Sequence, residues 1–597
     1  MNDDRRPLYF PSGDQTLFGW LHPARGAATS DVGVVICSPF GYETVCAHRS
    51  LRAFVDICAA SGMPALRFDY SGTGDSSGSV GEADQIAGWC DDIRAAIEVL
   101  ERTCGVRRIC LVGVRLGALL AGLVAAQGAI DAVIAVAPVT NGRRYLRELR
   151  ALRADASAET AGAAPADEAG PVTAEVGLDV TGFRLSQVSV ESLERIDLSK
   201  LSAGPRTAVL ILDRDDLPGA KPWAAALETE GVEVRYEALP GFTDMVSTPH
   251  AAVVPAAMAG AMAQWLEHYR RRAEPAEPKP AKISPQAPAH MRIKDESGVD
   301  LIERAMFIDG ERTLFAIVTE PAERAVGADT HGCGVVMLNG GATNHIGPNR
   351  MYVELSRCWA ARGYVVLRLD LAGLGDSATR PGEDNNQVYP PGALYDVGVA
   401  IEFLRRQRGV RNVTLAGLCA GAYHALRSAI SGLPVSTVLL VNPLTFYWKQ
   451  GSTLNDLQIS EVVRNPGLYA ENSFSLQHWS KLLRGRVKLW RVAMVFLRRG
   501  WLTVDSTLRD LCRKLRIRIP DDLGWDLQSV AARGIRIVFF FARGEAGSEL
   551  LKVQGGSALM RLGDRCHIHT IDGADHIFTQ RAARMRLLQL LSSELPH

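Results

Sequence analysis

A predicted strand, a sharp Gly-x-X-x-Gly turn and a predicted helix follow one another at two places in this chain. The central residue is Arg115 in the turn at 113–117 and Cys419 in the turn at 417–421. Such a turn lifts one side chain above the end of a parallel strand, and its flanking glycines are needed because the backbone there is too crowded for Cβ atoms. A thiol placed there can attack a carbonyl carbon, whereas a guanidinium cannot.

The two turns belong to an internal repeat. Residues 33–36 (GVVI) return as 334–337 (GVVM), and residues 66–76 (LRFDYSGTGDS) return as 367–377 (LRLDLAGLGDS), each 301 residues further along. The turns themselves lie 304 residues apart. Two matches with one offset indicate duplication of a whole fold unit.

Each copy alternates short β-branched runs with amphipathic segments. Expected helices of the first copy are Leu51–Ser61 and Ala87–Glu101, and the expected strands are 34–36, 65–68, 109–112, 132–136 and 208–212, followed by 413–416, 438–441 and 535–541 in the second copy. This order predicts the α/β class: two tandem domains, each a mainly parallel sheet with helices on both faces. Catalytic side chains are then expected at the carboxyl ends of the strands.

Composition predicts domain boundaries. The run AEPAEPKPAK at 273–282 is rich in proline and charge, so we expect a linker at 271–290 between domains at 1–270 and 291–597. Residues near 150–175 offer little apolar area and are expected to form a mobile insertion.

Charge and cysteine usage exclude several classes of function. Sixty-six basic and 66 acidic residues leave no net charge, which argues against a nucleic-acid partner. The 11 cysteines lack the paired spacing of a zinc site and indicate reduced thiols. With no apolar segment of membrane-spanning length and no signal-like start, we expect a soluble cytoplasmic protein without stable membrane insertion.

A dinucleotide site is not expected. Gly72-Thr73-Gly74 follows a strand, but residue 77 is Ser and the strand is the second of its copy, so the glycine fingerprint is incomplete and misplaced. We therefore predict no cofactor and no metal.

Both halves resemble α/β-hydrolase-fold domains, and the resemblance is clearest at the cysteine turn. The first half is similar to hydrolase-like relatives of the serine aminopeptidase group that carry Gly-x-Arg-Leu-Gly-Ala at this turn, and the second resembles hydrolases with a cysteine nucleophile. The resemblance implies the chain order nucleophile, acid, histidine. Relatives of this fold with cysteine at the turn include polyester synthases and some lactone hydrolases, so the resemblance implies either acyl transfer or hydrolysis.

The histidine is expected near the end of the chain. In the segment IDGADHIF at 571–578, His576 lies on a turn after a strand, where an imidazole can reach the thiol and act as general base. The corresponding residue of the first copy is Met245, which cannot accept a proton, and nearby His250 has no nucleophile to activate. Loss of both groups predicts that the first domain is a pseudoenzyme.

Two carboxylates compete for the role of triad acid. The strand at 535–541 is followed by Glu545, which aligns with Asp216 of the first copy, and Glu549 is the alternative. We favour Glu545, which would fix the imidazole tautomer. For Arg115 we expect pairing with Asp216 or with a neighbouring domain.

Backbone amides are expected to stabilise an oxyanion. One belongs to Ala420, the residue after the nucleophile, and the other to Gly341 in the loop LNGGA at 338–342. His345, just beyond that loop, is expected to make a loop hydrogen bond rather than to touch substrate.

A cap is expected near 447–530. From Lys481 to Arg518 there are 12 basic residues against Asp505 and Asp510, and the predicted cap includes the aromatic residues Trp448, Trp479, Trp490, Phe496 and Trp501. Such a segment favours a lid over an acyl pocket, with a cationic rim for coenzyme A or an acidic acyl-carrier protein as thioester partner, although an ordinary cap packed on its own domain remains open.

These features predict an acyl hydrolase or acyltransferase with a Cys419-His576-Glu545 triad and an acyl-cysteine intermediate, acting on a thioester. The competing hypothesis is a non-catalytic scaffold or carrier-docking module built from two inactive hydrolase folds. Self-association is left open.

Overall fold

The computed structural model describes residues 4–596 except 26–29, 80, 82, 129, 162–176, 202–206, 273–288, 296, 324–331, 450, 453–508, 510–511, 514 and 516. The chain divides into two compact units. Unit 1 comprises Met1–Ala325, Ala342–Gly363 and Ala372–Gln387. Unit 2 comprises Val326–Gly341, Tyr364–Leu371 and Val388–His597.

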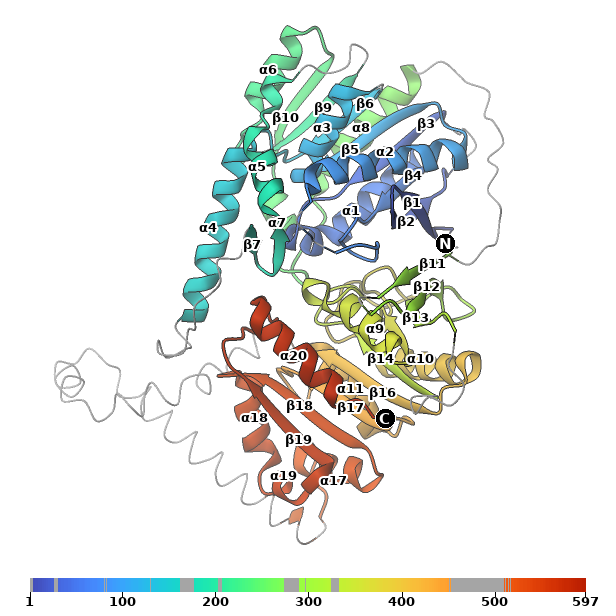
Figure 1. The fold of residues 1–597 in the computed structure, drawn as a ribbon, viewed down its shortest axis with the longest axis vertical. Helices are drawn as coiled ribbons and strands as arrows, with labels where there is room; N and C mark the ends of the chain where they lie inside the picture. The colour runs from blue at the N-terminus through green and yellow to red at the C-terminus, as the bar shows by residue number, and fades with distance from the viewer. Residues whose placement is uncertain are drawn as a thin grey trace, which may run out of the picture. The chain divides into compact units, whose positions relative to one another are not determined.

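Unit 1 contains an eight-stranded sheet in the order β1-β2-β4-β3-β5-β6-β9-β10 (Figure 1). The pairs β1/β2 and β2/β4 are antiparallel, and the remaining pairs are parallel. The bounds are β1 (Arg6–Ser12), β2 (Gln15–His22), β3 (Val32–Cys37), β4 (Ala65–Phe68), β5 (Arg108–Val114), β6 (Ala132–Val136), β9 (Ala208–Arg214) and β10 (Val234–Leu239).

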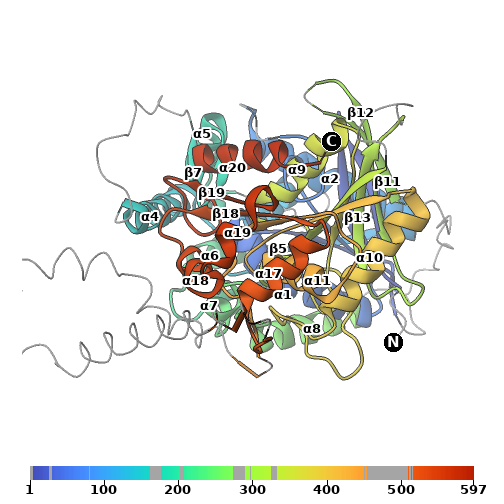
Figure 2. The same cartoon turned by 90° about the horizontal axis from the view of Figure 1, so that it is seen from below.

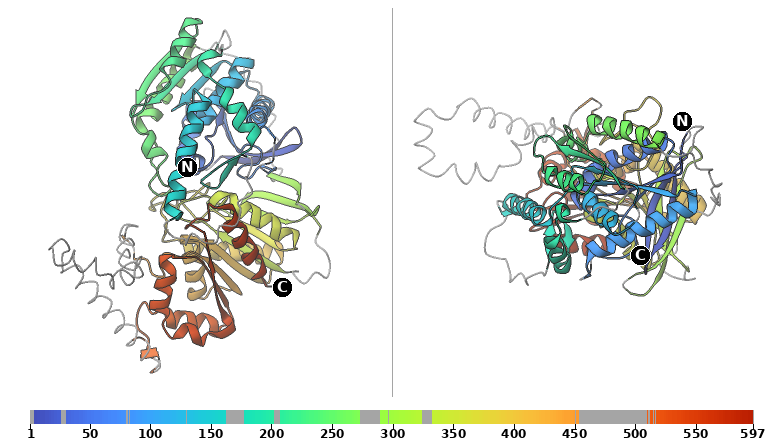
Figure 3. Two further views of the ribbon diagram at one scale, coloured as in Figure 1. Left: turned by 60° about the vertical axis from the view of Figure 1, so that its left-hand side comes forward. Right: turned by 90° about the horizontal axis from the view of Figure 1, so that it is seen from above.

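Helices cover both faces of this sheet, as Figures 1 and 3 show. On one face α2 (Gln85–Cys104) and α3 (Leu116–Gln127) enclose one apolar core, and on the other α1 (Tyr42–Ala60) and α8 (Ala256–Arg272) enclose a second. Adjacent strand residues alternate between these cores, as Val34 and Val35 do, because side chains point alternately to the two faces of a sheet. The smaller elements are α5 (Gln187–Arg195), α6 (Lys221–Thr229), α7 (Phe242–Met245), β7 (Leu178–Val180), β8 (Phe183–Leu185) and the short 3₁₀ turn Leu198–Lys200.

The first part of the segment predicted as a mobile insertion is helical, and its mobility stays a prediction. Residues 150–161 belong to helix α4 (Gly142–Ala161), whose side chains Tyr145, Leu146 and Leu149 are buried in the core. The alanine-rich stretch that lacks apolar area also has good helix propensity, so it continues the helix that the buried residues begin. The remainder of the prediction, 162–175, lies outside the described residues.

Unit 1 also contains segments of the second repeat. Strands β11 (Ala289–Lys294), β12 (Asp300–Phe307) and β13 (Phe315–Pro321) form antiparallel pairs, and a 3₁₀ turn (Pro348–Arg350) leads into α9 (Met351–Ala361). The hydroxyl of Ser76 accepts from the Phe18 amide at 2.9 Å, and the repeat-related Ser377 accepts from the Phe315 amide at 2.8 Å. Because the Phe18 and Phe315 rings stack 6.5 Å apart, equivalent corners of the two repeats meet within this unit.

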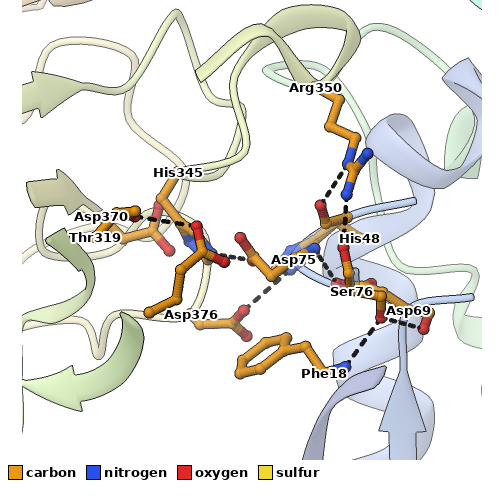
Figure 4. A network of polar contacts seen from close by, with 12 residues as sticks. Phe18, His48, Asp69, Asp75, Ser76, Thr319, His345, Arg350, Asp370 and Asp376 are labelled. Atoms are coloured by element: carbon orange, nitrogen blue, oxygen red, sulfur yellow. Dashed lines mark hydrogen bonds and ion pairs between the residues drawn. The ribbon is translucent and has the colours of Figure 1, made fainter. Parts of the chain in front are cut away.

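Buried ion pairs surround these corners (Figure 4). Asp75 and the repeat-related Asp376 are both buried, and each contacts a histidine: His345 Nε2 lies 2.7 Å from Asp75 and His48 Nε2 lies 3.5 Å from Asp376. Burial opposes ionisation of Asp376, but Arg67 and His48 hold its pKa well below the usual value. The buried charges are therefore paired, as their desolvation requires.

Unit 2 contains six parallel strands in the order β15-β14-β16-β17-β18-β19. Figure 2 shows α10, α11 and α17 on one face of these strands and α20 on the other. The bounds are β14 (Cys333–Leu338), β15 (Val365–Leu369), β16 (Asn412–Leu418), β17 (Thr437–Val441), β18 (Arg536–Ala542), β19 (Cys566–Ile571), α10 (Ala393–Arg408), α11 (Ala420–Ser431), α17 (Leu523–Ala532), α18 (Ala546–Gly555), α19 (Ala558–Arg561), the 3₁₀ turn Gly563–Arg565 and α20 (Arg581–Ser593).

The predicted α/β class with two mainly parallel sheets is confirmed, and the eleven cysteines, all within the described residues, are free. The run proposed as a linker falls largely on 273–288, and the centre of the predicted cap on 453–508, both outside the described residues. Among the described residues, no helix is both long and apolar enough to cross a membrane.

Candidate active site

Cys419 stands on a strained turn between β16 and α11. Its backbone has φ 56° and ψ −112°, and its amide donates to the Val441 carbonyl at 2.8 Å. A Cβ added to Gly417 would collide with the backbone of Gly421, and one added to Gly421 would collide with the carbonyl of Leu338. The glycines thus let strand, turn and helix pack closely enough to raise the half-buried Cys419 above the sheet.

The two proposed oxyanion donors lie on either side of this close approach. Ala420 is the first residue of α11, so its amide has no acceptor within the helix. Gly341 has φ 65°, a conformation that favours glycine, and a Cβ there would meet open space. Buried Asn339 fixes the loop before it, since its side chain donates to Asp370 at 2.8 Å and accepts from the Leu371 amide at 2.8 Å.

His576 lies on the loop between β19 and α20. Asp575 shapes this loop by accepting hydrogen bonds from the amide of Thr579 at 2.7 Å and from its hydroxyl at 2.8 Å. His576 Nδ1 is 3.1 Å from Glu545 Oε1, and the imidazole is about one third exposed, at 32%. Burial lowers the pKa of His576, but the charge of Cys419, together with hydrogen bonds to Cys419 and Glu545, raises this pKa well above its usual value.

The two candidate acids differ in what they contact. Glu545 directly precedes α18, is 12% exposed and faces His576. Glu549 is on the first turn of α18, is 42% exposed and accepts a hydrogen bond from Lys552 at 2.7 Å. The structure therefore brings Cys419, His576 and Glu545 together and directs Glu549 elsewhere.

Asn442 is a site residue that sequence reasoning missed. Fully buried at the end of β17, it donates from Nδ2 to the His576 carbonyl at 2.8 Å and accepts at Oδ1 from the Ala542 amide at 2.9 Å. It thus ties the histidine loop to the strand that leads to Glu545. The repeat held the signal, because Val441-Asn442-Pro443 aligns with Val136-Ala137-Pro138 and only the second copy has an amide there.

The corresponding turn of the first half is filled by ion pairs. Arg115 has nearly the same backbone, φ 53° and ψ −117°, and its guanidinium pairs with Glu43 at 2.8 Å and Glu148 at 2.9 Å. Burial opposes the charge of Arg115, but Glu43, Tyr145 and Glu148 raise its pKa. The expected pairing of Arg115 with Asp216 is wrong, because Asp216 lies with its own neighbour Arg214 at 2.5 Å.

The first half also differs from the second at the position of the histidine base. Met245 is fully buried in the apolar core beside Phe242, and the exposed His250 lies 3.4 Å from the hydroxyl of Thr248. Arg115 extends over the ring of Phe242 at 5.4 Å. Among the described residues, the first half therefore has neither a nucleophile nor a base at the two positions that correspond to Cys419 and His576.

Two other histidine sites carry no chemistry of this kind. His345 makes the expected loop contact, with Asp75, as described above. The ligand atoms of His567, His569 and Glu594 lie within 4.8 Å of one another, but Arg536 binds the Glu594 carboxylate at 3.3 Å and competes with any cation.

A family model matches part of each half. Residues 335–586 match the model of the alpha/beta hydrolase family, and residues 45–166 match that of serine aminopeptidase, S33. The comparison with curated proteins found no match.

Solved structures with a similar fold include three bacterial proteins. Est1E from Butyrivibrio proteoclasticus with ferulic acid bound is 16% identical, over 44% of this chain and 97% of that one, with a TM-score of 0.32. Proline iminopeptidase from Mycobacterium smegmatis is 16% identical, over 45% and 100%, with a TM-score of 0.31. A lidless α/β serine hydrolase from Xanthomonas campestris is 18% identical, over 47% and 99%, with a TM-score of 0.31. With matches in both halves, the chain consists of two tandem α/β-hydrolase-fold domains.

Proposed function

We propose that the second half is an acyl hydrolase or acyltransferase that works through a covalent acyl-Cys419 intermediate. The hydrolase-type family model supports the general class. The observation that carries the finer proposal is the placement of His576 against Glu545, with Cys419 acting electrostatically on the same imidazole.

The reaction proceeds in two steps. The sulfur of Cys419 attacks the acyl carbonyl carbon while His576 holds the thiol proton, and the amides of Ala420 and Gly341 donate to the oxyanion. When the oxyanion collapses, the bond to the leaving group breaks and His576 gives that group its proton. Glu545 keeps the proton of Nδ1 oriented and stabilises the imidazolium.

The acyl-cysteine is a thioester, so water, a thiol or an amine can accept the acyl group. Water gives hydrolysis, and His576 then removes the proton of the attacking water. We propose an acyl thioester as the donor, presented by coenzyme A or an acyl-carrier protein, and we place recognition of that carrier in the basic segment 481–518 of the sequence.

The first half is proposed to be a pseudoenzyme. Arg115 stands at the nucleophile position of its turn, and its guanidinium is committed to ion pairs with Glu43 and Glu148. The general base is missing as well, because Met245, which corresponds to His576, cannot accept a proton. This domain would contribute stability or docking but no chemical step.

The alternative is a scaffold in which both halves are inactive. Steady-state assays with p-nitrophenyl acetate and acetyl-CoA separate the two hypotheses. The enzyme hypothesis expects turnover by the full chain and none above background by Cys419→Ala, with Cys358→Ala as control because this exposed cysteine belongs to α9 and not to the turn. Equal rates for the full chain and Cys419→Ala contradict the enzyme hypothesis.

A further inference from the structure

The hydroxyl of Tyr389 is buried, and the described part of unit 2 offers it no hydrogen-bond partner. The residue is 7% exposed, and its phenolic oxygen has no hydrogen-bond partner among the described residues. Tyr447, by contrast, donates from its hydroxyl to Asp526 at 2.9 Å. A buried hydroxyl without an acceptor costs about 1–3 kcal/mol, so its retention points to a partner that arrives from outside the protein.

Aromatic contacts hold the Tyr389 ring in place. It stacks on Trp448 with ring centroids 4.3 Å apart, and the edge of Tyr423 meets it at 5.0 Å. The preceding residue is also fixed, since His424 Nε2 lies 3.3 Å from the Val388 carbonyl. Burial lowers the pKa of His424 to about 4, which keeps this imidazole neutral and able to donate that hydrogen bond from Nε2.

Tyr389 packs against the helical turn that follows the nucleophile, through its contact with Tyr423. Tyr423 lies one helical turn after Cys419, and its amide donates to the Cys419 carbonyl at 3.2 Å. Burial raises the pKa of Tyr389, and the charge of Cys419 raises it further, so the phenol stays protonated. A protonated phenol at this place is a hydrogen-bond donor without an acceptor.

We propose that Tyr389 donates a hydrogen bond to the carbonyl oxygen of the acyl group at Cys419. The inference rests on the proposed function and adds a side-chain donor to the two backbone amides. As the sulfur attacks, the carbonyl π electrons move to oxygen, and the hydrogen bond from Tyr389 strengthens with the growing charge while the phenol keeps its proton. A donor aimed at the oxyanion accelerates acylation and leaves alkylation of the same sulfur unchanged, because alkylation forms no oxyanion.

The test compares Tyr389→Phe, which removes only the hydroxyl, with Tyr447→Phe, which removes a half-buried hydroxyl that is already bonded to Asp526. The rate of acyl-enzyme formation with p-nitrophenyl acetate is followed by intact mass, and the rate of Cys419 alkylation by iodoacetamide is measured on the same proteins. We expect Tyr389→Phe to slow acylation about 10- to 100-fold, with kcat reduced more than KM rises, and to alkylate at the full-chain rate. Tyr447→Phe should acylate within about twofold of the full chain.

Acylation of Tyr389→Phe at the full-chain rate overturns the inference while leaving the proposed function intact. Equal slowing of acylation and alkylation also overturns it, because the tyrosine would then act only on the position of the sulfur. If the full chain forms no acyl adduct at all, the proposed function fails, and the inference fails with it.

Discussion

Cys419 and Arg115 hold almost the same strained backbone, with φ and ψ of 56° and −112° in one and 53° and −117° in the other. Positive φ at a residue with a Cβ costs free energy, and it persists where the surrounding packing requires it. The first half has therefore kept the turn that presents a nucleophile while its side chain is committed to Glu43 and Glu148. The shared backbone angles are therefore a requirement of the fold, whereas the side chain at this position decides whether the turn can present a nucleophile.

Cys419 should be alkylated before the other ten cysteines, although Cys358 is the exposed one among them. An imidazolium beside a sulfur stabilises the thiolate, which is the reactive form. Stoichiometric iodoacetamide followed by peptide mapping measures the order. His576→Ala should remove the preference for Cys419, and preferential labelling of Cys358 in the unaltered chain would count against the pairing of Cys419 with His576.

The pKa of His576 should fall when Cys419 is replaced by Ala. Burial alone lowers this pKa, and Cys419 contributes the first of the effects that raise it, so the raised value depends on the sulfur. Ring chemical shifts of His576 followed by NMR against pH measure the change. An unchanged titration in Cys419→Ala would show that the two groups do not interact.

The same shift sets the alkaline limb of the pH profile. A raised pKa keeps His576 protonated above its usual value of 6.5, and donation of the proton to the leaving group is lost as the pH rises through the raised pKa. We expect kcat/KM for acetyl-CoA to fall on the alkaline side only well above pH 6.5. A profile that already falls at that pH would contradict the assigned role of the imidazolium.

Asn442→Ala should damage both stability and acylation. It leaves the Ala542 amide and the His576 carbonyl without their buried partner, at a cost of about 1–3 kcal/mol. A displaced histidine loop should also slow acylation about 10- to 100-fold, with the substrate KM changed less than kcat. Exposed Asn412 provides the control, and Asn442→Ala with full acylation rate would show that the loop is positioned without it.

Replacing Arg115 and Glu43 together should leave the chemistry intact. Removing Arg115 alone leaves the half-buried carboxylate of Glu43 without its partner and is expected to destabilise the fold, so the informative variant is Arg115→Met with Glu43→Gln. The single-turnover acylation rate of this variant should match that of the unaltered chain. A large fall in that rate, in protein shown by circular dichroism to be folded, would make the first half catalytic.

The repeat made much of this architecture predictable, because local patterns fix strands and turns. The runs at 132–136 and 438–441 became strands at Ala132–Val136 and Thr437–Val441, and Cys419, His576 and Glu545 lie where strand ends were expected. Partners distant in sequence were not predictable: Glu43 reaches Arg115 from 72 residues away, and nothing local marks Tyr389 as a neighbour of Tyr423 on the nucleophile helix. Helix α4 was missed because composition reports apolar area and not helix propensity.

The central claim is that Cys419 carries the acyl group, and trapping that intermediate tests it most directly. The full chain is mixed with p-nitrophenyl acetate, quenched in acid and measured by intact mass, and the modified residue is located by peptide mapping. We predict one acetyl group per chain, on Cys419, and none on Cys419→Ala, whose melting temperature should stay close to that of the full chain because only a small side chain is lost. An adduct on another residue, or an adduct that persists in folded Cys419→Ala, would contradict the account.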